Sequence, residues 1–385
     1  MNCVYTPIAG DFDFVGDFSD GLAFVRNREK KCGYIDKLGE IVIPLEYACE
    51  ANCRFVSPQF CEGFAALFKN GKAGFVDKFG NVAVDFQYDY ADGFRDGLCV
   101  VRKGNLHGAI NTCGELVVPF EYDMLHSFCE DLAPAIKSGQ TGYINKNGGI
   151  AIPFAYDYAP ELNSQFSEGF ALVESNGCKG YIDKRGEVAI PFGLEYDEAQ
   201  SFHKGLAAVV TGIRADVTSK QGESSDEFRR RIDDARRHQR WGMIDRAGNV
   251  AIPVEYERIC YTAHGVSAIN ADTQHFYNEN GDFMFAMDYD YVGHFFSGLS
   301  TAKKGNMRCF INEVGEIEFS LPEGFDDVGS FFDGYAAVSV GEKYGFIDKA
   351  GNITVPVEYD SVSRFRDNAA VVKRDNKWGI LKLLL

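Results

Sequence analysis

The residues that most often carry chemistry in proteins are histidine, cysteine and the carboxylates, and their spacing in this chain assembles no catalytic motif. The seven histidines never pair at the spacing of metal ligands, and there is no G-x-S-x-G, H-E-x-x-H, P-loop or G-x-G-x-x-G that opens a helix. Cys49, Cys53 and Cys61 cluster in one connection, but a zinc site needs four ligands and usually two close pairs. We therefore expect no metal, no other cofactor and no enzymatic activity.

Seven carboxylates share one place in the sequence pattern, immediately before a short strand-like segment. Co-registered positions of a repeat lie on one rim, so these residues could form a negative band that steers a basic partner. The alternative, which we favour, is that they are turn residues whose carboxylates accept hydrogen bonds from backbone N–H groups. The seven residues are Asp20, Glu62, Asp96, Glu130, Glu168, Asp333 and Asp367.

A basic segment is the second candidate for a functional element, and it lies in an insertion over residues 212–240. Ser225 is placed to cap a short helix on which Phe228, Ile232 and Ala235 form one apolar stripe. Residues 228–240 contain six Arg and two Asp, a local charge of +4 in a chain of −17, so the remainder carries −21. The segment is either a recognition element for a partner, or a mobile hairpin tip or a strap that folds back onto the acidic rim. Its candidate partner-binding residues are Arg229, Arg230, Arg231, Arg236, Arg237 and Arg240.

The elements that must position these residues are internal repeats with a period close to 35 residues. Each unit opens with a short strand-like segment that carries a small residue two positions after its start and, in most units, an apolar residue four positions after it. This is a period-2 stripe on one face of a strand. The ten units open at Gly21, Gly63, Gly97, Asp131, Gly169, Gly205, Gly265, Gly298, Gly334 and Asn368.

Two further strands follow in each unit, and a tight turn joins them. The second strand ends in Asp/Asn-x-x-Gly, as in Asp36 to Gly39, which is the chemistry of a type I turn followed by a glycine with positive φ. The third strand reads, for example, Ile41-Val42-Ile43-Pro44, and its proline predicts a strand that ends there or lies at a sheet edge.

Aromatic residues recur at two places in the pattern, and we interpret them as packing between repeats rather than as a ligand platform. A phenylalanine precedes most unit starts by three residues, but the seventh unit has Thr262 there. The phenylalanines are Phe18, Phe60, Phe94, Phe128, Phe166, Phe202, Phe295, Phe331 and Phe365. The residues that follow the third strand are Tyr47, Tyr88, Tyr122, Tyr156, Tyr196, Tyr256, Tyr289, Phe325 and Tyr359.

Composition narrows the class of protein. The 385 residues include 45% hydrophobic ones, too many for a disordered chain, and 56 Asp+Glu against 39 Lys+Arg argue against nucleic acid as the main ligand. No apolar stretch is long enough for a membrane span, and no basic and apolar leader opens the chain. Eleven cysteines do not suggest a disulfide framework, so we expect a cytoplasmic protein.

The repeat pattern resembles the WG repeat of bacterial proteins over essentially the whole chain. The pattern runs F-x-[DE]-G-[LFY]-A-x-V, then K-W-G-[YFI]-I-[DN]-x-x-G, then [IV]-x-I-P-x-x-Y-[DE]. Its best copies of the second segment are Arg240-Trp241-Gly242-Met243-Ile244-Asp245 and Lys377-Trp378-Gly379-Ile380. The resemblance implies a binding or scaffolding module without a chemistry common to the family. Two of ten copies keep the tryptophan, and its place is taken elsewhere by Cys32, Ala73, His107, Thr141, Lys179, Arg308 and Tyr344.

We predict an all-β fold of about ten antiparallel repeats that form either a β-propeller-like ring or an open β-superhelix. Residues 1–385 form one array, in which residues 1–20 are a partial unit, 21–367 are nine complete units and 368–385 are another partial unit. The first partial unit contains the third strand and the returning segment that the last partial unit lacks. This arrangement is compatible with one sheet shared between both ends of the chain, and equally with caps on an open stack.

Two functions fit this sequence. The first is a non-enzymatic scaffold that binds a protein or peptide, a basic one included, across the repeat surface. The alternative is a module that binds a glycan or small ligand through exposed tyrosines and carboxylates at a repeat rim. A membrane is not expected as a partner in either case.

Overall fold

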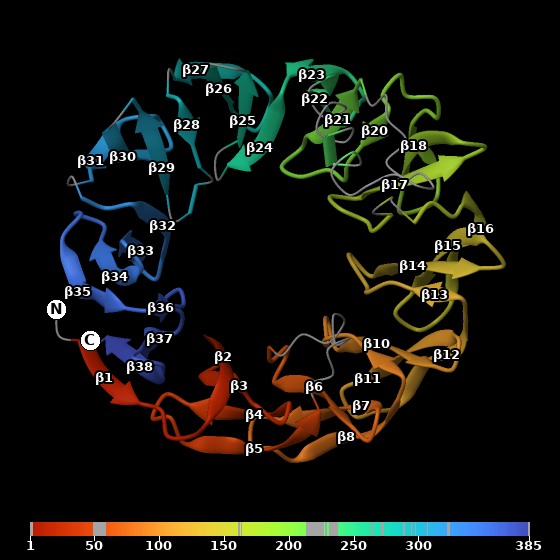
Figure 1. The fold of residues 1–385 in the computed structure, drawn as a ribbon. Coiled ribbons are helices and arrows are strands. Elements are labelled where there is room, and N and C mark those ends of the chain that lie inside the picture. The colour runs from red at the N-terminus through yellow and green to blue at the C-terminus, as the bar shows by residue number, and fades with distance from the viewer. Residues whose placement is uncertain are drawn as a thin grey trace.

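Small antiparallel sheets make up the computed structural model, which describes residues 3–383 except 49–58, 161, 163, 213–226, 228, 231–237, 263–264, 271–272, 288, 294, 297, 306 and 322–323. The sheets form ten blades, numbered 1 to 10 along the chain, and Figure 1 shows the blades side by side around a ring. Two sheets have seven strands and span two blades each, which are joined by the single pairs Ala48↔Phe68 and Asp157↔Glu174. The all-β prediction is confirmed. Within a blade the strands follow chain order from the centre of the ring outward.

The strands of blades 1 to 5 have the following bounds. They are β2 (Phe12–Ser19), β3 (Leu22–Asn27), β4 (Lys31–Asp36) and β5 (Ile41–Ala48); β6 (Phe64–Lys69), β7 (Lys72–Asp77) and β8 (Val82–Tyr88); β9 (Tyr90–Ala91), β10 (Leu98–Lys103), β11 (Leu106–Asn111) and β12 (Leu116–Tyr122); β13 (Met124–Leu125), β14 (Leu132–Lys137), β15 (Gln140–Asn145) and β16 (Ile150–Asp157); β17 (Phe170–Ser175), β18 (Cys178–Asp183) and β19 (Val188–Ile190).

Blades 6 to 10 follow the same plan, and blade 10 takes its outermost strand from the start of the chain. The strands are β20 (Glu198–Ala199), β21 (Ala207–Thr211), β22 (Arg240–Ile244) and β23 (Val250–Tyr256); β24 (Arg258–Thr262), β25 (Gly265–Asn270), β26 (Thr273–Tyr277) and β27 (Phe283–Met287); β28 (Tyr291–Val292), β29 (Leu299–Lys304), β30 (Met307–Asn312) and β31 (Ile317–Ser320); β32 (Asp327–Phe332), β33 (Tyr335–Val340), β34 (Lys343–Asp348) and β35 (Ile353–Tyr359); β36 (Ser361–Val362), β37 (Ala369–Arg374), β38 (Lys377–Leu383) and β1 (Cys3–Pro7).

The predicted Asp-x-x-Gly turns join the third strand of a blade to its outermost strand. In blade 1 the carboxylate of Asp36 accepts hydrogen bonds from the amides of Leu38 and Glu40, at 2.7 and 3.0 Å. Gly39 has a φ of 81° and donates its amide to the Asp36 carbonyl. A side chain would be strained at that φ, so the glycine of the pattern is explained by the backbone.

The core lies between the blades. Among the described residues, the buried apolar side chains fall into ten clusters, and each cluster joins two neighbouring blades. Phe18, Phe202 and Phe365 are at most 1% exposed, and Tyr47, Tyr122 and Tyr256 are at most 2% exposed. The interpretation of the repeated aromatics as packing is confirmed.

The two ends of the chain share one sheet, and this closes the ring. β1 pairs antiparallel with β38 from Cys3↔Leu383 to Pro7↔Gly379. Phe12 of blade 1 packs in the same cluster as Val371 and Ile380 of blade 10, and the indole Nε1 of Trp378 donates a 3.0 Å hydrogen bond to the Phe12 carbonyl. Of the two predicted arrangements, the ring is therefore the one observed (Figure 1).

The strand pairing in blade 7 shows that the start of the seventh unit was predicted one residue too late in the sequence. Thr262 pairs with Gly265 across residues 263–264, as Cys61 pairs with Phe64 across Glu62 and Gly63. The unit therefore starts at residue 264, and the aromatic three residues earlier is Tyr261, not Thr262. Tyr261 packs against the cluster between blades 6 and 7 and donates a 3.1 Å hydrogen bond to the Leu206 carbonyl. The prediction that the seventh unit has Thr262 in place of this aromatic residue was therefore wrong.

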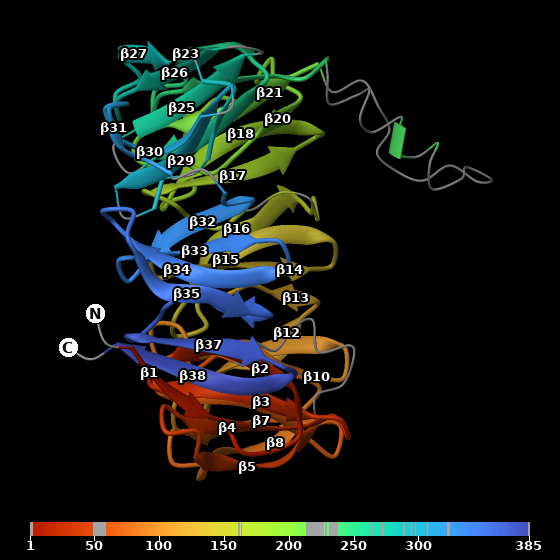
Figure 2. The same cartoon turned by 60° about the vertical axis from the view of Figure 1, so that its left-hand side comes forward.

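The ring has two distinct faces because strand direction alternates within each blade. The acid-Gly turns and the Asp-x-x-Gly turns emerge on one face, which we call the turn face. The hairpins between the second and third strands emerge on the other, which we call the hairpin face. Figure 2 shows the ring from the side, with the strands running between the two faces. No helix in the part of the chain described here is long and apolar enough to span a membrane.

Candidate functional site

The seven predicted carboxylates all lie in two-residue turns on the turn face. Each of these residues has a positive φ, between 46° and 54°, and five of the seven are followed by a glycine, while Glu130 precedes Asp131 and Asp367 precedes Asn368. The structure therefore brings them into equivalent positions around one face of the ring, as the repeat register predicted.

Five of these carboxylates accept a hydrogen bond from the backbone of the next blade. The amide of Gly97 donates to Glu62, that of Gly169 to Glu130 and that of Gly205 to Glu168, at 2.7–3.0 Å. The same contact links the last blades, where Asn368 donates to Asp333 at 3.3 Å, and crosses the ring closure, where Gly21 donates to Asp367 at 2.9 Å.

Cationic side chains of the next blade complete this network. Lys78 lies 3.3 Å from Asp20, Lys146 lies 3.5 Å from Asp96, and Lys184 lies 3.1 Å from Glu130. Each lysine directly follows the first residue of an Asp/Asn-x-x-Gly turn.

Glu168 has the fullest set of partners. Partial burial raises its pKa, but hydrogen bonds from Arg246 and from the amides of Gly205 and Lys204 outweigh burial and leave the pKa below its usual value. The carboxylates therefore join neighbouring blades, which supports the turn interpretation over a free negative band.

One blade boundary carries the same ion pair with its charges exchanged. Blade 6 has Lys204 at the carboxylate position, and blade 7 has Glu279 at the position that is Lys or Arg in most other blades. The two side chains lie 3.2 Å apart, so the exchange preserves the contact. Lys204 also donates to the Thr262 carbonyl at 3.2 Å, which ties it to blade 7 a second time.

This exchange gives a testable prediction. Lys204→Glu places two carboxylates together and should lower the free energy of unfolding by about 0.5–1 kcal/mol, the usual size for a partly exposed pair. Adding Glu279→Lys should recover most of that loss, because the double variant restores the orientation found at the other boundaries. Urea denaturation of the wild type, both single variants and the double variant measures the coupling. Additive losses would show that the two side chains do not interact.

The basic insertion leaves the ring on the hairpin face. Thr211 at the end of β21 pairs directly with Arg240 at the start of β22, whereas Lys204 and Gly205 lie at the opposite end of β21. Both roots of the insertion are therefore on the face opposite the carboxylates. Arg240 is half-buried, and its guanidinium donates to the Gln239 carbonyl at 2.7 Å.

The structure describes only part of the predicted helix. The backbone is helical at Glu227, Arg229 and Arg230, and these three residues are exposed. Arg231, Arg236 and Arg237 lie outside the described residues, as do Ser225, Phe228, Ile232 and Ala235.

A polar group that sequence reasoning missed lies between blades 6 and 7. The hydroxyl of Tyr256 lies 2.8 Å from Nδ1 of His275 and 2.5 Å from the hydroxyl of Tyr277. Burial and the bond to Tyr277 raise the pKa of Tyr256. His275 occupies the place of the glycine in the WG pattern, and this exchange was the sequence feature that could have revealed the group.

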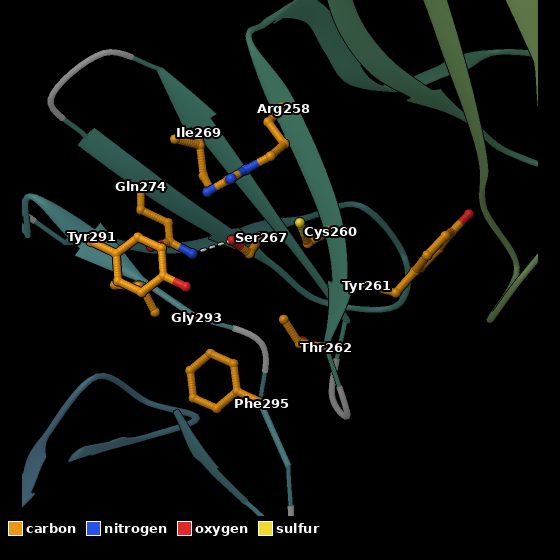
Figure 3. A pocket seen from close by; sticks show the side chains of 11 residues that line it. Arg258, Cys260, Tyr261, Thr262, Ser267, Ile269, Gln274, Tyr291, Gly293 and Phe295 are labelled. Carbon is orange, nitrogen blue, oxygen red and sulfur yellow. Dashed lines mark hydrogen bonds between the residues drawn. The ribbon is translucent and has the colours of Figure 1, made fainter. Parts of the chain in front are cut away.

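A small polar pocket lies between blades 7 and 8 (Figure 3). The side chains of Gln274 and Ser267, both at most 4% exposed, are hydrogen-bonded to each other, and Tyr291 and Phe295 face them from the strand and connection of blade 8. Its volume of about 30 Å³ has room for ordered water but lies far below the roughly 300–1,000 Å³ of small-molecule sites.

The cysteines in the described part of the chain are free thiols. Burial raises the pKa of Cys99 well above its ordinary value, and it also raises those of Cys61 and Cys260. These thiols are therefore poor nucleophiles and poor metal ligands at neutral pH. Cys49 and Cys53 lie outside the described residues, so their proposed cluster with Cys61 is not placed. Among the residues described, no group of three His, Cys, Asp or Glu side chains could hold a metal ion.

Comparison with solved structures finds matches at low sequence identity. A eukaryotic initiation factor is 11% identical, with a TM-score of 0.48 over 80% of this chain and 88% of its own. BamB from Moraxella catarrhalis is 10% identical, with a TM-score of 0.34 over 99% of this chain and 98% of its own. None of the curated proteins matches the chain in sequence.

The repeats themselves match a family model described as WG containing repeat. The matched residues are 8–30, 33–48, 74–106, 108–140, 142–177, 180–212, 241–269, 276–307, 310–344 and 344–378. These matches cover well over half of the chain and follow the blades in order, with the gap at 213–240 falling on the insertion. The chain therefore belongs to the family of proteins built from the WG repeat.

Proposed function

We propose that this protein is a non-enzymatic scaffold that binds a protein partner on its hairpin face, with the insertion at 212–240 as the recognition element. One observation carries the proposal: Thr211 and Arg240 pair as direct neighbours, so the inserted residues leave and re-enter the sheet at a single point. In most other blades the equivalent hairpin closes in two residues, as between Lys69 and Lys72, and in blade 1 it closes in three. The ring therefore folds around this connection without needing its length.

The positive charge of the insertion favours a partner that has an acidic surface. Arg229 and Arg230 are exposed in a segment of charge +4, while the rest of the chain carries −21. The rim carboxylates do not compete for these arginines, because they lie on the opposite face and are bonded to neighbouring blades. Exposed guanidinium groups favour carboxylate-rich surfaces, where they form bidentate hydrogen bonds.

The glycan alternative has less support. It requires exposed tyrosines beside free carboxylates at a repeat rim. The repeat tyrosines Tyr47, Tyr88 and Tyr122 are at most 4% exposed, and the carboxylates are engaged between blades.

The decisive experiment replaces residues 213–239 with Asn-Gly. We expect the free energy of unfolding to stay within about 1 kcal/mol of the wild type, because loop length alone contributes little. Binding to a partner isolated from the native host should be lost, both in this deletion and in the charge reversal of Arg229, Arg230, Arg236 and Arg237. Isothermal titration against the purified partner measures the loss, and the wild-type affinity should fall as salt rises.

The matched control reverses three cations of the turn face, Lys78, Lys146 and Lys184, and should leave partner affinity unchanged. A partner that binds the deletion variant with wild-type affinity would refute the role of the insertion. Unfolding of the ring on deletion would instead show that the segment is structural.

A further inference from the structure

The outermost strand of most blades is a sheet edge, whereas β5 and β16 each pair with the next blade through one residue. Most blades protect the outermost strand in two ways. The first is a proline three residues after the first residue of the strand, at Pro44, Pro119, Pro153, Pro191, Pro253 and Pro356. The second is a bulge: in blade 1, Tyr34 pairs with Ile43 but Cys32 pairs with Tyr47, so β5 runs four residues opposite two. Prolines and bulges both prevent another strand from pairing with an edge.

The bulge explains the glycine of the WG pattern. A Cβ on Gly345 of blade 9 would lie 2.6 Å from the Val355 carbonyl oxygen and 2.8 Å from the backbone of Pro356. The bulged outer strand presses its carbonyls against this position, so only glycine fits there.

β27 of blade 7 lacks the proline and the bulge that lies opposite the glycine position in other blades. Ala286 stands at the proline position, and the ladder runs straight through Gln274↔Met287, His275↔Ala286 and Phe276↔Phe285, before a register shift at Met284 that pairs Tyr277 with Phe283. Because the outer strand runs straight opposite this position, His275 replaces the glycine. Blade 8 shares this arrangement in part, with Cys309 at the glycine position and Ser320 paired straight across from it.

β27 begins with two apolar side chains that are open to solvent. Phe283 is 57% exposed and Met284 is 45% exposed, and β27 lies at the outer circumference of the ring with no strand beyond it (Figure 1). An exposed carboxylate lies on either side of the strand in sequence, Asp282 directly before Phe283 and Asp290 three residues after Met287.

We infer that β27 is a strand-addition site for an extended peptide that has alternating apolar residues and basic residues at both ends. The unpaired backbone groups of β27 would supply main-chain hydrogen bonds, and Phe283 and Met284 would contact alternate side chains of the peptide. The acidic residues at the two ends of β27 select the basic ends of the peptide. This site is separate from the insertion, which leaves blade 6 on the hairpin face.

Charge argues against a second copy as the occupant. Two β27 strands that pair antiparallel would bring the acidic start of one strand beside the acidic end of the other. Like charges across a strand pair are destabilising. A basic-ended peptide meets the same carboxylates favourably.

The test uses the fluorescein-labelled peptide Lys-Lys-Val-Thr-Val-Thr-Val-Lys-Lys and the full chain. We expect saturable binding by fluorescence polarisation, with slowed hydrogen exchange at the amides of residues 283–287. Phe283→Lys combined with Met284→Lys should weaken binding at least about tenfold, a loss of about 1.4 kcal/mol. Ile353→Lys is the matched control, because Ile353 is also 57% exposed at the same place in β35, which has both a proline and a bulge. It should leave binding unchanged.

Peptide variants test the two parts of the proposal separately. Replacing the central valine by proline should abolish binding, and Glu in place of all four Lys should weaken it at least about tenfold. Deletion of residues 213–239 should not affect the peptide, so failure here and failure of the insertion as a recognition element are distinguishable.

Three results would overturn the inference: equal affinity in the Phe283/Met284 variant, protection from exchange at another strand, or no binding at millimolar peptide. A concentration-dependent dimer that sedimentation detects in the wild type and not in that variant would also overturn it, because β27 would then pair with a second copy.

Discussion

A chain without residues 1–17 should lose about 5–9 kcal/mol of stability and fail to form a monomeric ring. The deletion removes β1, which covers the edge of β38, and most of β2. It also takes Ile8, Phe12 and Val15 out of the cluster between blades 10 and 1, and each buried apolar side chain contributes about 1.5–3 kcal/mol. Since whole domains are stable by only about 5–15 kcal/mol, most of that margin would disappear.

Thermal unfolding followed by circular dichroism, together with light scattering, measures this loss. We expect a large fall in Tm and association through the uncovered edge of β38. A chain that lacks only residues 1–2 keeps β1 and should behave as the wild type. If the chain without residues 1–17 stayed monomeric with an unchanged Tm, the shared sheet would not hold the ring closed.

Gly345→Ala should lower the free energy of unfolding by about 2–3 kcal/mol, in the range of overpacking substitutions. The new Cβ meets backbone atoms of Val355 and Pro356 rather than the end of a flexible side chain, so the outer strand has to move. Adding a methyl group to glycine in an unstrained strand would be neutral or stabilising, which makes the sign of the effect informative.

Cys309→Ala provides the control at the same place in blade 8. That position already holds a Cβ because β31 runs straight beside it, and the change removes only a buried sulfur. We expect a loss of about 1 kcal/mol, in the range of ordinary single substitutions. Chemical denaturation measures both variants, and equal losses would show that the bulge does not impose the glycine.

The repeated elements were predictable because their causes are local. A carboxylate or amide at the start of a turn and a glycine at its end specify the backbone within four residues, as Asp36 and Gly39 do. Ring closure was not predictable. It depends on the angle between packed blades summed around the array, and no single unit encodes that sum.

The register error at blade 7 has a physical cause. Most other units mark their start by a glycine in the left-handed region, whereas Ala263 and His264 stand at the equivalent places in the sequence of this unit, so Gly265 was mistaken for the start. As a result, Tyr261 was one residue away from the expected aromatic position. Strand pairing corrected the error because a shift of one residue reverses which face of a strand is buried.

The carboxylates of the turn face were located by sequence, but their partners were not. The partner cations lie one repeat further along, and only the packing of neighbouring blades brings Lys184 to Glu130. The exchange of Lys204 with Glu279 was visible in the sequence, because the side-chain charge is reversed at both repeat positions. In the same way, Ala286 at the proline position and His275 at the glycine position were visible in the sequence of one unit and indicated that its outermost strand, β27, differs from the others.

The shared sheet also has a consequence for how the chain folds during synthesis. Cys3 pairs with Leu383, so β1 waits for its partner until nearly the whole chain has been translated. At about 5–20 residues per second this interval lasts on the order of tens of seconds. Throughout it, the apolar side of blade 1 that carries Phe12 and Phe18 has no neighbour. The nascent chain is then an open arc, and β1 of one such arc can complete the last sheet of another, so crowded ribosomes favour swapped dimers over closed rings.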